Sequence, residues 1–503
     1  MIKMSNRFFS TLRLRSNRFF STLCLQSNRF FSTLCLQRKF AMLALLSLVA
    51  ASSLRGQELA PFKAGDRVAF VGNSITDGGH YHSYLWLYYM TRFPNQPLWM
   101  MNCGIGGDTS TEILGRLKGD VIDRKPNVIL LTYGMNDAGL FQLYSDTAAV
   151  FSEHRVAEAK ENMLKMEQQL QQLPSTRIVM IGTSPYDETT RFNKDIFPKK
   201  ADNIRRIVAD QKKIAERNNW EFFNFEEQMT AFNRERQQTD STFTLCGSDR
   251  IHPDNDGHMY MACLILKAQG LAEKKVAETA IDAKKLRVVT SENCEISNLK
   301  EEKDKGQELS FDYLAHALPY PLDTIARGGM EFKRPQCRIV NLMPDFMDKM
   351  NAELLRIGQL KKGCYELKID DVVIDTLSHE QLAAGINLAV YDQTPQMQQA
   401  RTIMMLNEDR WDMERRLRDW AWVEFDYFKK NGHDDVNSAE ARAMYERDKV
   451  GNWWIASRRD IYAKTGQPAV RKACKRYMQT VVDEIYNMNK PVVHHFTLRM
   501  LKD

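Results

Sequence analysis

A serine, an aspartate and a histidine of this sequence have the types and the spacing of a nucleophilic catalytic triad. Ser74 follows an apolar run, and Asp249 and His252 are separated by only two residues further along the chain. A serine hydroxyl is a weak nucleophile at neutral pH, so it needs a neighbouring base such as an imidazole to take its proton. Asp249 can hydrogen-bond the other ring nitrogen of His252 and fix its tautomer. Together, these three residues predict that Ser74 attacks a carbonyl carbon.

Three further groups are candidates for stabilising the negative oxygen that this attack creates. They are the backbone N–H groups of Ser74 and Gly107 and the side-chain amide of Asn136. Loss of one such donor costs about 3–4 kcal/mol of transition-state stabilisation in enzymes where it has been tested. A glycine at 107 leaves room for the substrate oxygen, and Gly72 permits a tight turn before the serine. The predicted oxyanion hole is therefore Ser74, Gly107 and Asn136.

The elements that position these residues form an alternating pattern of strands and helices. Apolar runs predict buried strands at 67–71, 98–103, 127–133, 177–182 and 220–225. Helical patterns lie at 81–93, 110–124, 148–173, 200–218 and 255–270. Strands that are apolar on both faces and alternate with helices predict a doubly wound α/β domain with a parallel sheet. Ligands of such sheets bind beyond the carboxyl ends of the strands, which is where the candidate residues fall.

Four sequence segments together resemble the motif blocks of the SGNH (GDSL-like) hydrolases. They are Gly72-Asn73-Ser74, the loop 102–108 with Gly107, Gly134-Met135-Asn136-Asp137 and Asp249-Arg250-Ile251-His252. The resemblance covers about 65–270 and departs from the family pattern at Asn73, where Asp is more common. It implies a flavodoxin-like three-layer α/β/α fold and ester hydrolysis through an acyl-enzyme.

Simpler structural explanations exist for the same residues. Ser74 is also a residue type favoured as the N-cap of a helix. The glycines of 104–107 lack the dinucleotide fingerprint and the P-loop lysine, so no nucleotide cofactor is expected. The segment 249–258 imitates part of an EF-hand loop but lacks its closing glutamate, so no metal is expected either. For His80 and His82, which closely follow the nucleophile, contact with substrate is the alternative to the expected position on the surface.

The N-terminal segment predicts export. Residues 1–37 contain three near-copies of an 11-residue unit, interpreted as a duplication that is not part of the fold. Residues 38–56 combine two basic residues, an apolar run at 40–51 and small residues, which is the pattern of a signal peptide. The apolar run is about half the ~20 residues of a membrane-spanning helix. We therefore expect a periplasmic or extracellular protein with no stable membrane span after signal cleavage.

The charge distribution argues against a nucleic-acid partner. The net charge is +6, but residues 1–56 contain nine basic residues and no acid, leaving 61 basic and 64 acidic residues in the remainder. A slightly acidic remainder has no basic face for nucleic acid in its bulk composition. Nine cysteines occur, of which seven lie beyond the N-terminal segment. Because seven is odd, we expect buried thiols and at most one disulfide.

The hydrolase-like domain, assigned to 57–275, is followed by two regions of different character. A small β-rich module is expected at 276–376, with strands at 286–289, 308–313, 337–342, 364–369 and 372–374. Asp370-Asp371 suits the tight turn of its last hairpin. A helical C-terminal region is expected at 377–503, with helices at 378–384, 395–429, 437–464 and 467–488. Its tryptophans are expected in the core rather than on a sugar-binding surface; they are Trp411, Trp420, Trp422, Trp453 and Trp454.

The predicted function is hydrolysis of a carboxylic ester. Export and the family resemblance favour a small ester or an acylated carbohydrate as the substrate. A lipid esterase or lysophospholipase is the alternative among enzymes, and an apolar acyl groove would distinguish it. The alternative from another class is a catalytically silent binding protein with the same fold, which the intact set of Ser74, Asp249 and His252 disfavours.

Overall fold

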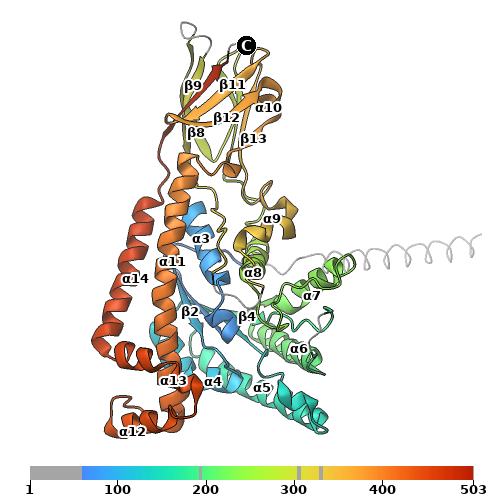
Figure 1. Cartoon of the computed structure of the whole chain (residues 1–503), viewed down its shortest axis with the longest axis vertical. Helices are drawn as coiled ribbons and strands as arrows, with labels where there is room; N and C mark the ends of the chain where they lie inside the picture. The colour runs from blue at the N-terminus through green and yellow to red at the C-terminus, as the bar shows by residue number, and fades with distance from the viewer. Residues whose placement is uncertain (1–58, 192–194, 303–307, 328–331, 502–503) are drawn as a thin grey trace, which may run out of the picture. The chain divides into compact units, whose positions relative to one another are not determined.

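A five-stranded parallel sheet forms the centre of the region that carries the candidate triad (Figure 1). The computed structural model describes residues 59–191, 195–302, 308–327 and 332–501. The predicted repeats and signal peptide lie outside these residues. The strands are β1 (Arg67–Gly72), β2 (Trp99–Gly104), β3 (Val128–Tyr133), β4 (Arg177–Gly182) and β5 (Glu221–Asn224). Their order, β2-β1-β3-β4-β5, is that of a flavodoxin-like sheet, so the predicted α/β fold is confirmed.

Alternate residues of each strand face two separate hydrophobic cores. On β1, Val68 and Phe70 belong to one core, and Ala69 and Val71 belong to the other. The first core is closed by α3 (Tyr81–Arg92), α7 (Phe225–Arg236) and α8 (Asn255–Ala268). The second is closed by α4 (Ser110–Arg116), α5 (Ala148–Leu170) and α6 (Lys200–Asn218). Helices therefore cover both faces, and the polar loops lie at the ends of the strands.

Two further sheets share one core beyond this domain. The first has the order β13-β10-β6-β7, with β6 (Ala277–Asp282), β7 (Arg287–Glu292), β10 (Glu353–Gly358) and β13 (Ile386–Asn387). The second has the order β12-β11-β14-β9-β8, with β8 (Cys294–Glu302), β9 (Glu308–Ala315), β11 (Cys364–Ile369), β12 (Val372–Ser378) and β14 (His494–Met500). Asp370 and Asp371 turn the hairpin between β11 and β12 with φ of 47° and 68°, as the sequence predicted.

Two expectations for this part of the chain were wrong. The run 337–342 is not a strand but a short 3₁₀ turn followed by α9 (Ile339–Leu342). Ile339 and Leu342 are buried three residues apart, whereas Val340 between them is exposed, which is a helical and not an extended pattern. The region 377–503 is not only helical, because β13 and β14 belong to the sheets. The partners of β14 lie far away in sequence, so no local pattern revealed it.

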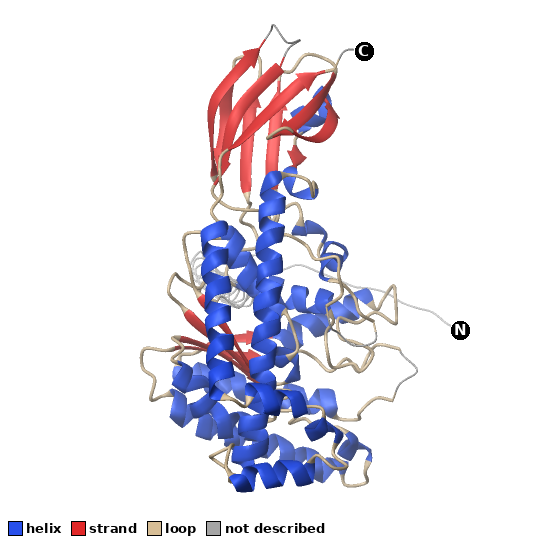
Figure 2. Cartoon of the chain, turned by 60° about the vertical axis from the view of Figure 1, so that its left-hand side comes forward, coloured by secondary structure: helices blue, strands red, loops and turns tan. Residues whose placement is uncertain are grey.

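The helical region contains two long helices side by side, α11 (Pro395–Ala421) and α14 (Pro468–Met488) (Figure 2). The helix predicted at 395–429 continues past α11 as a π-helical turn, η7 (Trp422–Phe428). The single helix predicted at 437–464 is divided into α12 (Ala439–Asp448), α13 (Trp453–Ala456) and η9 (Ile461–Thr465). Gly451, with φ of 80°, lies at the break between α12 and α13.

The five tryptophans of the helical region differ in exposure, and Trp422 is half-buried. Trp411 and Trp420 are buried, as predicted, whereas Trp453 and Trp454 are 73% and 39% exposed, which contradicts the expectation for those two. All seven cysteines among the described residues are free thiols, and five of them are buried. Among the described residues, no helix combines the length and the apolar content that crossing a bilayer needs.

Candidate active site

Ser74, His252 and Asp249 form a chain of hydrogen bonds at the carboxyl edge of the sheet. Oγ of Ser74 lies 2.7 Å from Nε2 of His252. Nδ1 of His252 lies 2.5 Å from Oδ2 of Asp249. The structure therefore brings together the three residues predicted from the sequence, in the order that lets His252 accept the hydroxyl proton while Asp249 orients the ring.

The turn from Asp249 to His252 is held rigidly by its own backbone and by a neighbouring loop. Oδ1 of Asp249 accepts hydrogen bonds from the backbone N–H groups of Ile251 and His252, at 2.9 and 3.0 Å. Burial raises the pKa of Asp249, but its hydrogen bonds with His252 outweigh burial and leave the pKa below the ordinary value. Arg250, with φ of 67°, donates from Nη1 to the carbonyl oxygens of Asp187 and Thr190. This arrangement keeps Asp249 ionised beside the imidazole.

The serine begins the four-residue helix α2 (Ser74–Asp77), directly after β1. The N-cap is Asn73, whose Oδ1 accepts from the backbone N–H of Ile75 at 3.1 Å, so Ser74 is not the cap. The carboxamide oxygen of Asn73 accepts this bond just as the carboxylate of an aspartate, the more common residue in the family, would. The asparagine at 73 therefore preserves the helix cap. The Ser74 hydroxyl therefore remains available to His252. Its backbone N–H belongs to the first helical turn, where N–H groups have no intrahelical acceptor.

The loop after β2 contributes the second predicted oxyanion donor, Gly107. Its φ of 93° lies in the left-handed region, which explains the need for glycine. No protein atom lies within 4 Å of the position that a Cβ would occupy, so packing does not demand a glycine. Backbone conformation, rather than close packing, is the structural reason for this residue.

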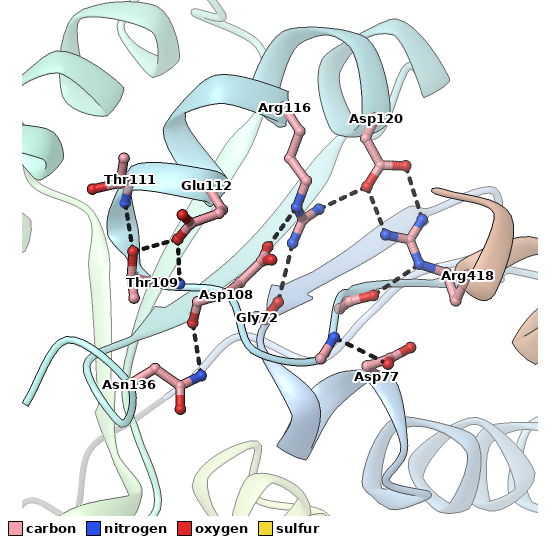
Figure 3. Close-up of polar contacts among 12 residues, drawn as sticks. Gly72, Asp77, Asp108, Thr109, Thr111, Glu112, Arg116, Asp120, Asn136 and Arg418 are labelled. Atoms are coloured by element: carbon pink, nitrogen blue, oxygen red, sulfur yellow. Dashed lines mark hydrogen bonds and ion pairs between the residues drawn. The ribbon is translucent and has the colours of Figure 1, made fainter. Parts of the chain in front are cut away.

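The third predicted donor, Asn136, lies on the loop after β3 and is connected to the Gly107 loop (Figure 3). Its Nδ2 donates to the carbonyl oxygen of Asp108 at 2.9 Å. An amide nitrogen carries two hydrogens, so a second N–H remains for an oxyanion. Asp137 holds the same loop, because its two carboxylate oxygens accept from the backbone N–H groups of Ser110 and Gly134, at 2.8 and 3.1 Å. Asp137 therefore connects the loop that carries Asn136 to the start of α4.

A buried arginine, Arg116, connects these loops and had no signal in the sequence. Its guanidinium donates to Oδ2 of Asp108 at 2.7 Å, to Oδ2 of Asp120 at 2.6 Å and to the carbonyl oxygen of Gly72 at 3.0 Å (Figure 3). It therefore ties the loop of Gly107 to the end of the strand that precedes Ser74. A charged residue on a helix is ordinarily solvated, so only the fold reveals that this one is internal.

Three histidines near the serine are buried, contrary to the surface location expected for two of them. They are His80, His82 and His258. Burial lowers the pKa of His82 to about 4, and it lowers the pKa of His258 well below its ordinary value. Nε2 of His82 lies 3.1 Å from the carbonyl oxygen of Thr76, so this ring supports α2. His82 and His258 are therefore neutral at physiological pH.

A cavity of about 180 Å³ opens beside the serine and the histidine of the triad. Its lining mixes polar and apolar surface; it consists of Ser74, Ile75, Gly78, Gly79, His80, His252, Pro253, Asp254, Asn255, His258 and Arg327. The described part of the chain contains no cluster of three or more His, Cys, Asp or Glu side chains arranged to hold a metal ion. The site is therefore a small recess of mixed polar and apolar lining beside the candidate nucleophile.

Buried Asp108 forms a carboxyl pair with half-buried Asp426 of η7, and their side chains share a hydrogen bond. Burial raises the pKa of both carboxyl groups above the ordinary 3.8, although the Arg116 guanidinium opposes this shift. Glu112 and Lys430 also face Asp426, with opposite effects on its pKa. Above about pH 4 the unfolded chain has released a proton that the folded protein still holds on this pair. The pair therefore lowers the free energy of unfolding as pH rises.

Asp426→Asn is expected to make the free energy of unfolding less dependent on pH. The variant keeps a hydrogen-bonding partner for Asp108 and removes one of two carboxylates that repel at high pH, a gain of the order of 1 kcal/mol at pH 8 relative to pH 5. Urea unfolding followed by circular dichroism at both values measures this difference. Asp123→Asn, at an exposed ion pair with Lys118, is the matched control. An equal pH dependence in wild type and Asp426→Asn would contradict the shared proton.

Known protein families match both the region of the parallel sheet and the helical C-terminal region of this chain. Residues 70–260 match the GDSL-like lipase/acylhydrolase family, and 401–490 match the diltiazem deacetylase C-terminal helical domain. A solved structure described as BT4096, a gut microbial diltiazem-metabolizing enzyme, is 49% identical with a TM-score of 0.85, over 89% of this chain and 100% of that one. An acetylxylan esterase from Geobacillus stearothermophilus is 28% identical over 222 residues, or 41% of this chain and 95% of that enzyme. The match to the GDSL-like lipase/acylhydrolase family, at 70–260, includes every candidate site residue.

Proposed function

Because this chain belongs to the SGNH (GDSL-like lipase/acylhydrolase) family and is an ester hydrolase, we propose that it removes short acyl groups from carbohydrates, with Ser74 as nucleophile. The single observation that carries the assignment of the nucleophile is the 2.7 Å contact between Oγ of Ser74 and Nε2 of His252. The membership in a hydrolase family sets aside the alternative of a silent binding protein. Export to the periplasm or the outside of the cell is part of the proposal and is supported by the signal pattern at 38–56.

The proposed reaction has two halves. In the first, Oγ of Ser74 attacks the ester carbonyl while Nε2 of His252 takes the hydroxyl proton, and His252 then delivers that proton to the departing alcohol. The backbone N–H groups of Ser74 and Gly107 and the amide of Asn136 stabilise the tetrahedral oxyanion. In the second half, His252 activates water, which attacks the acyl-enzyme and releases the acid and the free serine.

The size of the cavity supports a short acyl group. A lipid esterase needs a long apolar groove for its acyl chain, whereas the recess beside Ser74 has a volume of only about 180 Å³. His80, His258 and Arg327 contribute to its walls. An acetyl group therefore suits the recess better than a fatty acyl chain. The similarity to an acetylxylan esterase and to the diltiazem deacetylase C-terminal helical domain agrees with acetyl removal.

Two exposed tryptophans support a bulky alcohol portion with a flat face, such as a sugar ring. Trp453 and Trp454 of α13 lie 5.4 Å apart between ring centroids. The guanidinium of Arg458 contacts both Trp454 and Trp422, at 4.1 and 4.3 Å from their ring centroids. Trp422 belongs to η7, the same turn that carries Asp426 against Asp108 of the Gly107 loop. The exposed tryptophans of α13 are thus connected, through Arg458 and Trp422, to a turn that contacts the Gly107 loop.

Activity should fall as the acyl chain lengthens. Among p-nitrophenyl esters, we expect kcat/KM to drop by at least about 10-fold from acetate to octanoate, because a recess of about 180 Å³ cannot enclose the added methylenes. Acetylated xylo-oligosaccharides should release acetate with wild-type enzyme and not with Ser74→Ala. A preference for octanoate over acetate would instead support the lipid esterase.

N-terminal sequencing of the protein from a periplasmic or culture fraction tests export, with a start beyond residue 56 expected.

A further inference from the structure

The long helix α11 covers the open edge of the sheet in the hydrolase domain. β2 is an edge strand, so one side of its backbone has no neighbouring strand. Glu414 of α11 accepts from the backbone N–H of Asn102 through Oε1 at 2.9 Å. Arg418, one turn further, donates from Nε to the carbonyl oxygen of Gly104 at 2.9 Å. Side chains of α11 thus replace the missing strand, and they do so at the point where β2 enters the loop of Gly107.

Arg418 is held in a buried network of alternating charges (Figure 3). Its Nη1 and Nη2 form a two-point ion pair with Oδ1 and Oδ2 of Asp120, at 2.8 and 2.7 Å, and its side chain is 3% exposed. Burial would raise the pKa of Asp120, but Arg418 and Arg116 outweigh burial and hold that pKa below its ordinary value. Arg116 continues the network to Asp108. The geometry of a two-point pair fixes direction as well as distance.

A second arginine of the same helix, Arg415, holds the other side of the loop. Its Nη1 donates to the carbonyl oxygen of Asp77 at 2.7 Å and forms an ion pair with the Asp77 carboxylate. Oδ2 of Asp77 accepts from the backbone N–H of Gly106 at 3.1 Å. Asp77 is the last residue of the helix that Ser74 begins. Arg415 therefore acts on both the serine helix and the residue before Gly107.

We propose that Arg418 and Arg415 are positioning residues for the oxyanion hole, which makes the C-terminal helical region a working part of the active site. This inference rests on the proposed function. No protein atom packs against the Cα of Gly107 where a side chain would be, so the direction of its N–H depends on its neighbours. Those neighbours are held through the Gly104 carbonyl, the Gly106 N–H and the Asp108 carboxylate. Because Asp108 also accepts from Asn136, displacement of the loop moves two donors together.

Arg418→Met retains the apolar stem and removes the guanidinium. We expect kcat for p-nitrophenyl acetate to fall about 10- to 100-fold with KM changed by less than about 2-fold, because the lost contacts act on the transition state. Affinity for a boronic acid, which forms a tetrahedral adduct on a serine, should weaken by a similar factor. Arg418→Lys, which keeps the charge but not the two-point geometry, should lie between wild type and Arg418→Met.

Arg92→Met is the matched control. Arg92 is also buried and donates to the carbonyl oxygen of Met350, away from the loops of the site. Arg415→Met, at a less buried position, repeats the test if Arg418→Met does not fold. The inference would be overturned if folded variants of both arginines had wild-type kcat and boronate affinity. It would also be overturned if Arg92→Met lost as much kcat and boronate affinity as they do. Activity in Ser74→Ala would instead overturn the proposed function, so the two failures are distinguishable.

Discussion

Ser74→Ala is expected to lower the turnover of p-nitrophenyl acetate by at least about 10⁴-fold while leaving the circular dichroism spectrum unchanged. The variant removes the only atom that attacks the ester in the proposed reaction, and the oxyanion donors alone supply the residual rate. The fold should persist because the helix is capped by Asn73 and not by the serine. Steady-state kinetics with purified protein, at equal concentrations of folded enzyme, measures the effect.

Two comparisons make this result specific to the triad. Ser152→Ala removes a buried serine hydroxyl on α5 and should retain wild-type turnover. The double variant of Ser74 and His252 should be no slower than Ser74→Ala alone, because residues that act as one unit have non-additive effects. Wild-type turnover by folded Ser74→Ala would exclude this serine as the nucleophile.

Asn136→Ala is expected to lower kcat about 10²- to 10³-fold with little change in KM, because the lost N–H acts on the oxyanion and not on the ground-state ester. The bond from Nδ2 to the carbonyl oxygen of Asp108 is lost at the same time, which loosens the connection between two loops. Stopped-flow measurement of p-nitrophenol release separates acylation from the later steps, and the loss should appear in acylation.

A matched asparagine lies at the opposite end of the same strand. Asn127 precedes β3, and its Oδ1 accepts from the backbone N–H of Arg67 at 2.7 Å. Asn127→Ala should therefore cost stability and leave kcat unchanged. Equal kcat in Asn136→Ala and wild type would remove Asn136 from the proposed oxyanion hole.

Much of the hydrolase domain could be predicted from local patterns. The five strand positions followed from apolar runs, and the candidate triad followed from short motifs placed just after them. A parallel sheet brings the carboxyl ends of its strands to one edge whatever the intervening chain does, so Ser74 and His252 could be placed together without coordinates. The burial of His80 and His82 could not be predicted in the same way. Both rings contact Trp411, which lies more than 300 residues further along the chain.

By itself, the sequence determined the class of the hydrolase domain and the identity of the residues that face one another across its active-site edge. Only the tertiary structure decided what holds them, because Arg415 and Arg418 look like ordinary surface charges of a helix until β2 is known to be an edge strand. It also decided the composition of the β-rich module, where β14 enters the middle of a sheet from the end of the chain. The physical reason is common to both cases: backbone groups without a local partner are satisfied by whichever distant segment the fold brings to them.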